Sequence, residues 1–143
     1  MADHAVHLST TWVGFVKGKG ELESPGLQAP IAIPEHFGGT GKGANPKQLL
    51  MAAAASCYVM TFVAMAQARS IDATRISLSS DLSTRADKGL HLEHQVTVKL
   101  APDATEEDRK AVDALISSAD KACMVGNLLK AGGMTIEVRR ALA

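Results

Sequence analysis

The chain has 143 residues, a length typical of one domain, and we expect a single domain over residues 1–143. Its 15 basic residues equal its 15 acidic residues, so no charge excess attracts a polyanion. Aromatic residues make up only 3% of the chain, which leaves few side chains on which bases could stack. The composition therefore argues against binding to nucleic acid or to an anionic membrane surface.

The N-terminal residues lack the basic start and the apolar run of a signal peptide, so we expect a cytoplasmic location. Thiols stay reduced in that compartment, which argues against a structural disulfide. The two cysteines, Cys57 and Cys123, are then either inert core residues or redox catalysts. Two cysteines are also too few for a zinc site of the four-cysteine type.

The first third of the chain is predicted to form strands and a loop. Spaced apolar residues over residues 6–20 predict one strand, which ends in the turn Lys17-Gly18-Lys19-Gly20. Residues 27–33 predict a shorter strand that pairs with it, and Pro30 indicates an edge position. A glycine-rich loop over residues 35–46 follows, with a flexible backbone suited to binding or gating.

A long helix is predicted next. Asn45 provides a good N-cap and Pro46 fits the first helical position, and strong helix formers continue from Lys47 to about Arg69. Residues 49–66 carry no charge, which reaches the lower limit of a membrane span. Many of them are small or weakly polar and insert poorly, and amphipathic strands elsewhere need a helix to cover them. We expect a buried core helix rather than a membrane span.

The second half of the chain predicts two strands, a helix and a last strand. Alternating apolar residues between positions 74 and 100 predict an antiparallel pair with a turn at Asp87-Lys88-Gly89. Thr105 caps a helix with acidic residues in its first turn, and the apolar stripe of this helix ends at Cys123. A short helical piece to Gly132 precedes the last strand. The element order predicts an α+β fold with antiparallel sheets packed on two long helices.

The two cysteines are the main candidates for chemistry. Cys57 lies more than three turns into the long helix. It falls on a predicted buried stripe with Leu49, Leu50, Ala53 and Ala64. Taken alone, each cysteine could be an inert core residue that packs as a small hydrophobic side chain. Because both helices are expected to pack on one sheet, the thiols of Cys57 and Cys123 could instead meet as a functional pair.

A nucleophilic cysteine reacts as its thiolate, which an ordinary thiol pKa leaves scarce at neutral pH. Cys57 lies too far from the start of its helix to use the helix dipole, so we expect a cation from another element. Lys17 and Lys19 are the candidates, with a solvated turn as the alternative. Lys47 lies ~15 Å from Cys57 along the helix axis, too far for easy contact.

Other site types have weaker support. His91 and His94 lie three residues apart on a predicted strand and so face opposite sides, which argues against a metal site. His94 falls on the apolar face, where a hydrogen-bonded core or interface histidine is expected. The glycine-rich loop lacks the spacing of a phosphate-binding loop, and no Ser/His/Asp arrangement can be defined.

Several motifs resemble the OsmC/Ohr family, named after osmotically inducible protein C and organic hydroperoxide resistance protein. The helix entry NPKQLLMAAAASCYVM is similar to the family's Asn-Pro-Glu-(Glu/Gln)-Leu followed by an Ala-rich segment and a cysteine. The segment KACMVGNLL resembles the family's second cysteine segment, and Trp12-Val13-Gly14 and the glycine-rich loop match in order. The resemblance covers nearly the whole chain.

The resemblance implies an OsmC-like fold, an intertwined homodimer with active sites at the interface, and no metal or organic cofactor. It implies a peroxidase for organic hydroperoxides, and also hydrogen peroxide, in defence against oxidative and osmotic stress. Cys57 would be the peroxidatic cysteine and Cys123 would condense with its sulfenic acid to form a disulfide. A dithiol, of the lipoyl type in this family, would restore both thiols. The alternative is a non-catalytic relative that binds a ligand or senses redox state.

Three positions depart from the family pattern and predict a divergent member. Lys47 stands at the family's glutamate position, where the acid orients an arginine beside the thiolate, and Lys17 is the nearest match to that arginine. Two lysines keep positive charge near Cys57 but lose the planar, bidentate geometry. Met124 replaces the proline that follows the second cysteine.

Overall fold

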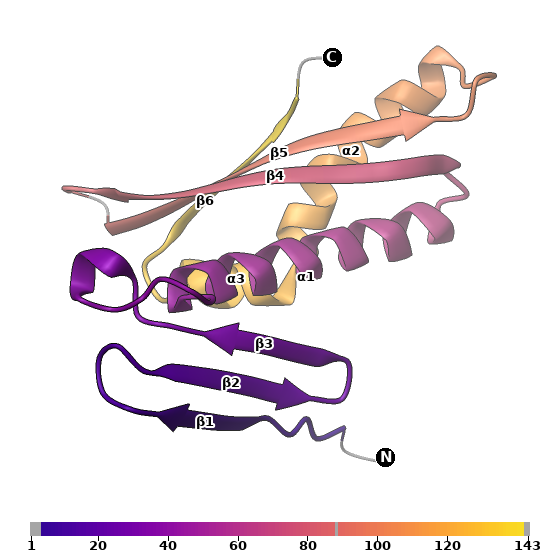
Figure 1. Cartoon of the computed structure of the whole chain (residues 1–143). Coiled ribbons are helices and arrows are strands. Elements are labelled where there is room, and N and C mark those ends of the chain that lie inside the picture. The colour runs from indigo at the N-terminus through magenta and orange to yellow at the C-terminus, as the bar shows by residue number, and fades with distance from the viewer. Residues whose placement is uncertain (1–3, 88, 142–143) are drawn as a thin grey trace. The chain divides into compact units, whose positions relative to one another are not determined.

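The computed structural model describes residues 4–87 and 89–141 of the chain (Figure 1). These residues form two three-stranded sheets and three α-helices, which confirms the predicted α+β class. Residue contacts divide the chain into two compact units, one ending at Leu49 and the other beginning at Leu50. The single domain over residues 1–143 stays a prediction, and Lys88 of the predicted turn lies outside the described residues.

The first unit contains an antiparallel sheet of three strands in chain order. The strands are β1 (Ser9–Val13), β2 (Lys19–Ser24) and β3 (Leu27–Ile31). The predicted strand over residues 6–20 was wrong, because this range holds β1, a turn and the start of β2. Gly14 has a φ of +94°, and a side chain at Gly18 would collide with the Val13 carbonyl. These two glycines therefore place the turn before the predicted one, which began at Lys17. As a result β3 pairs with β2 and not with the first strand.

The second unit contains a mixed sheet and most of the helical residues. The remaining elements are η1 (Glu35–Phe37, a short 3-10 helix of the first unit), α1 (Pro46–Ala68, which begins in the first unit), β4 (Ala73–Arg85), β5 (Gly89–Leu100), α2 (Glu106–Ala122), α3 (Met124–Ala131) and β6 (Thr135–Arg140). The strand order is β4-β5-β6, and β4 pairs antiparallel with β5 as predicted. However, β6 pairs parallel with β5, so the prediction of antiparallel sheets is wrong for this pair. A parallel pair needs a long crossover, and α2 and α3 provide it.

The core of the second unit joins α1 and α2 to one face of the sheet. Buried residues of α1 recur every four positions and those of α2 follow the predicted apolar stripe; the buried set is Ala54, Tyr58, Phe62, Ala66, Val112, Leu115, Ile116 and Ala119. Leu92 and Val96 of β5 are fully buried. The Tyr58 hydroxyl donates to the Ile116 carbonyl at 2.8 Å, which satisfies a buried polar group and fixes α1 against α2.

Two predicted helix caps are confirmed. Asn45 Oδ1 accepts from the Gln48 amide at 3.0 Å, and Gln48 Oε1 accepts from the Asn45 amide at 3.0 Å. Thr105 Oγ1 accepts from the Asp108 amide at 3.2 Å, and the Asp108 carboxylate accepts from the Thr105 amide at 2.8 Å. Each reciprocal pair satisfies amides that a helix start leaves free.

The helix α1 is apolar on both sides but buried on one. By length and composition alone it is the one described helix that could cross a membrane. Opposite the buried stripe, Met60 is 71% exposed and Val63 is 50% exposed. Ala53 and Ala64 are also exposed, so the predicted stripe with Cys57 was wrong and Cys57 lies at the edge of the true one. The predicted core helix is therefore a helix that packs on one side.

Candidate active site

Cys57 lies in the middle of α1, directly before the buried Tyr58. Its side chain is half-buried and packs against the core formed by α1 and α2. Thr61, one turn later, donates its hydroxyl to the Cys57 carbonyl at 2.7 Å. The core thus fixes the backbone at Cys57 while the sulfur stays partly open to small molecules.

Cys123 lies at the break between α2 and α3, where it is the C-cap of one helix and the N-cap of the other. Its extended backbone, with φ −70° and ψ 111°, ends α2, and its side chain is buried. The sulfur accepts from the Gly126 amide at 3.4 Å, as a serine oxygen does at an N-cap. A Cβ at Gly126 would lie 3.3 Å from the sulfur, so a glycine gives the thiol its room.

The thiols of Cys57 and Cys123 lie within hydrogen-bonding reach of each other. Burial raises the pKa of Cys57, but hydrogen bonds from the Val125 amide, the Cys123 thiol, Thr61 and the Met124 amide together bring it below its ordinary value. The single Thr61 proton is already donated to the Cys57 carbonyl. We therefore attribute the lowered pKa to the two amides and the second thiol.

The pKa of Cys123 changes in the opposite direction. Burial raises it most, the Gly126 amide opposes this, and the neighbouring Cys57 and the Asp120 carboxylate raise it further. Asp120 is itself held by Lys130 at 3.0 Å. At neutral pH Cys57 is the better thiolate of the pair, and Cys123 stays a protonated thiol.

The donors to Cys57 come from the start of α3. Met124 and Val125 are the first two residues of this helix, and such amides have no partner inside their own helix. They also carry the positive end of the helix dipole. We expected a cation to lower the pKa of Cys57, and within the second unit amides of another helix lower it instead. A backbone amide leaves no side-chain signal in a sequence; the available hint was that Cys123 directly precedes a helical segment.

Comparison with known proteins identifies the family. The family model for OsmC-like protein matches residues 39–139, a range that includes both cysteines. The chain belongs to the OsmC-like family. Peroxiredoxin OsmC of Escherichia coli (strain K12) is 32% identical over 125 residues, which cover 84% of this chain and 86% of that protein. The uncharacterized protein YmaD of Bacillus subtilis (strain 168) is 31% identical over 134 residues, or 91% of this chain and 89% of the relative.

A solved structure shows the same fold. The organic hydroperoxide resistance protein OsmC from Legionella pneumophila covers 98% of this chain and 100% of its own, with a TM-score of 0.68 and 21% identity. The OsmC-like fold and the family resemblance predicted from the sequence are thereby confirmed.

The lysines predicted to act in this OsmC-like site belong to the first unit. Lys17 is exposed in the turn after β1, and it lines a hollow of about 350 Å³ together with Lys19 and Lys42. Lys47 is exposed in the first turn of α1 and lines a different hollow of about 410 Å³. The structure thus brings Lys17 and Lys19 together, but not Lys47. The role of these lysines beside Cys57 stays a prediction.

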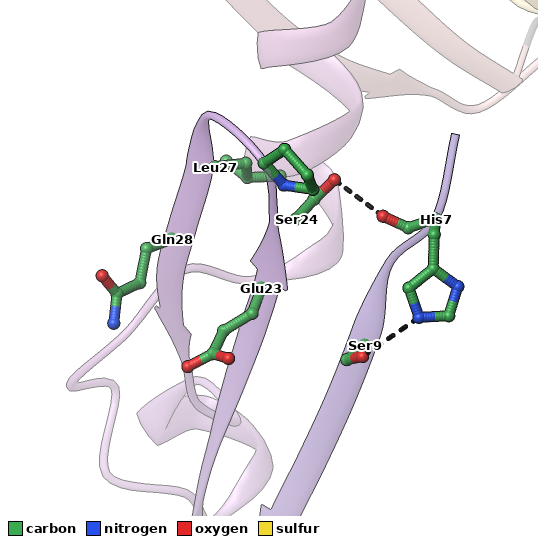
Figure 2. A pocket seen from close by; sticks show the side chains of 7 residues that line it. His7, Ser9, Glu23, Ser24, Leu27 and Gln28 are labelled. Atoms are coloured by element: carbon green, nitrogen blue, oxygen red, sulfur yellow. Dashed lines mark hydrogen bonds between the residues drawn. The ribbon is translucent and has the colours of Figure 1, made fainter. Parts of the chain in front are cut away.

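Another hollow in the first unit, of about 480 Å³, holds a serine beside a histidine (Figure 2). The His7 ring lies 3.3 Å from Ser9 Oγ, and the Ser24 hydroxyl donates to the His7 carbonyl at 2.7 Å. His7 and Ser9 are exposed, and Ser24 is half-buried. Among the described residues no hydrogen bond joins Glu23 to the His7 ring. Without a group that orients the imidazole, this serine is not an activated nucleophile.

His94 lies in the core of the second unit, as predicted. Only 2% of it is exposed, its Nδ1 lies 2.7 Å from Ser80 Oγ, and its ring centroid lies 5.8 Å from that of Tyr58. Burial lowers the pKa of His94, and the charge of Asp120 opposes this only in part. His94 is therefore a neutral, hydrogen-bonded core residue.

Proposed function

We propose that the protein is a thiol-dependent peroxidase that reduces organic hydroperoxides, and also hydrogen peroxide, in defence against oxidative and osmotic stress. The observation that carries this proposal is the asymmetric thiol pair. The pKa of Cys57 is lowered while that of Cys123, within hydrogen-bonding reach, is raised. Membership of a family that includes a protein named peroxiredoxin supports the same activity.

The proposed reaction begins at the half-buried Cys57. Its thiolate attacks an oxygen of the hydroperoxide, the O–O bond breaks, and the leaving alkoxide takes up a proton to become an alcohol. Cys57 is oxidised by two electrons to a sulfenic acid. The Met124 and Val125 amides hold the thiolate in place before this attack and lower its cost of formation.

Cys123 is proposed to resolve the sulfenic acid. Its sulfur attacks the Cys57 sulfur, an S–S bond forms, and the hydroxyl group leaves with the Cys123 proton as water. A dithiol reductant, proposed to be of the lipoyl type, then supplies two electrons and two protons and becomes a disulfide itself. Because its pKa is raised, Cys123 does not compete with Cys57 for peroxide.

We further propose a homodimer located in the cytoplasm. The exposed apolar face of α1, with Met60 and Val63, supports burial against a second copy, since such patches are uncommon on monomers. A reducing compartment would keep both thiols ready for turnover. In the assembled protein Lys17 and Lys47 are proposed to add positive charge near Cys57.

The test is consumption of cumene hydroperoxide with dihydrolipoamide as reductant. We expect the wild-type protein to turn over and the Cys57→Ser variant to fall to the uncatalysed rate. The matched control is Ser56→Ala, the preceding and exposed residue of α1, which should keep the wild-type rate. A wild-type rate no higher than that of Cys57→Ser would refute the enzyme and favour a ligand-binding or redox-sensing protein.

A further inference from the structure

The sheet face opposite to α1 and α2 holds a histidine and two glutamates close together. His91 and Glu93 lie two residues apart on β5 and therefore share a face, opposite to that of Leu92. Glu137 of β6 stands directly across from Glu93 in the parallel register. One possible ligand atom from each of the three residues lies within 4.8 Å of the others.

His91 is buried and has one ring nitrogen without a partner. The residue is only 5% exposed, and its Nδ1 lies 2.6 Å from Thr135 Oγ1. Its Nε2 has no hydrogen-bond partner among the described residues, and it lies 3.5 Å from Glu137 Oε2. If the ring proton is on Nδ1 and is donated to Thr135 Oγ1, Nε2 keeps a lone pair that is available to a cation. A metal-binding histidine has this arrangement, in which a hydrogen bond at one nitrogen fixes the other as the ligand.

The two carboxylates need a positive charge between them. Carboxylates directly opposite each other on neighbouring strands repel. Arg139 supplies the charge in this structure, with Nη2 3.0 Å from Glu137 and Nε 3.8 Å from Glu93. The Arg139 side chain is 60% exposed and free to turn into solvent.

We propose that His91 Nε2 and the carboxylates of Glu93 and Glu137 bind a divalent transition-metal cation, of which Zn²⁺ is representative. One imidazole and two carboxylates form a ligand set that Zn²⁺ accepts, with an open fourth position for water. Bonds of this type place tetrahedral ligand atoms about 3.4 Å apart, close to the 3.5 Å between His91 and Glu137. Rotation of the partly exposed Glu93 side chain completes the set.

The bound cation would displace Arg139 and join β6 to β5 at the edge of the sheet. This site lies on the opposite sheet face from the core that contains Cys123, so it is independent of the proposed peroxidase. Its chemistry differs too, because thiolates take no part in the ligand set.

The first test is calorimetric titration of Zn²⁺ into the full chain carrying Cys57→Ser and Cys123→Ser, which removes the competing thiols. We expect one Zn²⁺ per chain. In both Glu137→Gln and His91→Gln the affinity for Zn²⁺ should be at least about ten-fold lower. His7→Gln, at an exposed histidine outside the cluster, is the matched control and should bind as the parent does. Absence of binding, or equal affinity in the parent and in Glu137→Gln, overturns the site.

A second test uses the competing cation. Arg139→Gln should tighten Zn²⁺ binding, because the metal no longer has to displace a guanidinium. If Arg139 had only a structural role, this substitution would not increase the affinity for Zn²⁺. Zn²⁺ should also raise the melting temperature of the parent and leave that of Glu137→Gln unchanged. The Glu137 side chain is 46% exposed, so this variant is expected to fold even if the variant of the buried His91 does not. Unchanged or weaker binding in Arg139→Gln contradicts the proposal.

Discussion

The surroundings of Cys57 and of Cys123 differ although their thiols lie within reach of a hydrogen bond. Cys57 sits on an unbroken helix, half-open, and faces the free amides at the start of α3. Cys123 sits at the break between two helices, buried and close to the carboxylate of Asp120. Donors lower one thiol pKa, while burial and negative charge raise the other. The helix that carries Cys57 is thus not the helix whose amides lower its pKa.

Two substitutions of Cys123 should have the largest effect on this difference. Cys123→Ala and Cys123→Ser both prevent the proposed disulfide, so turnover with a dithiol should fall on the order of ten-fold or more. The serine hydroxyl still donates to the Cys57 sulfur, and the alanine does not. We therefore expect the pKa of Cys57, measured from the pH dependence of alkylation, to rise in Cys123→Ala alone. An equal pKa in both variants would show that the second thiol is no donor.

The pH dependence of alkylation should separate the two thiols in the wild-type protein. Iodoacetamide reacts with the thiolate, so a lowered pKa moves the midpoint of reaction to more acidic pH and a raised pKa moves it to more alkaline pH. Mass spectrometry of each cysteine peptide should give the lower midpoint for Cys57 and the higher for Cys123. In denaturant the midpoints should converge. If both thiols had the same alkylation midpoint in the folded protein, their pKa values would not differ and the proposed asymmetry would be wrong.

A smaller effect is expected from the carboxylate beside Cys123. Asp120→Asn removes a negative charge that raises the pKa of Cys123, so the alkylation midpoint of this thiol should move to lower pH. Asp113→Asn is the matched control, because this exposed residue of α2 pairs with Arg140 instead. The idea fails if both variants shift the Cys123 midpoint equally.

The smallest effect is expected at the first residue of α3. Met124→Pro removes the weakest amide donor to Cys57, so the pKa of this thiol should rise slightly. Proline is favoured at the first helical position, and the extended backbone of Cys123 tolerates a following proline. The free energy of unfolding should change by less than about 0.5 kcal/mol, since Met124 is 74% exposed. Met124→Ala keeps the amide and should leave the pKa unchanged.

Local signals predicted the helices better than the strands. The reciprocal caps at Asn45 and Thr105 are short-range chemistry, and both helices begin where these residues predict. The strand β2 was missed because Lys19–Ser24 mixes charged and small residues and has only one buried position, Leu22. The parallel pairing of β6 depends on where the crossover returns the chain, which no local pattern encodes.

For the site, the sequence predicted the residues but not their surroundings. Both cysteines could be placed at helix positions that pack inward, and the structure brings them together. The groups that lower the pKa of Cys57 include backbone amides, which nearly every residue carries, so no residue type pointed to Val125. Lys17 and Lys47 were predicted because they stand at the positions of the family's arginine and glutamate. Their role beside Cys57 stays a prediction.

The break at Cys123 couples the oxidation state of the thiols to the end of a helix. The sulfur that caps α3 through the Gly126 amide is the same atom that would enter a disulfide with Cys57. A disulfide would bring this sulfur to about 2 Å from that of Cys57, and we expect this shift to weaken the cap on the first turn of α3. Hydrogen exchange at the Gly126 amide should then quicken on oxidation and slow on reduction, which makes one backbone proton a reporter of the redox cycle.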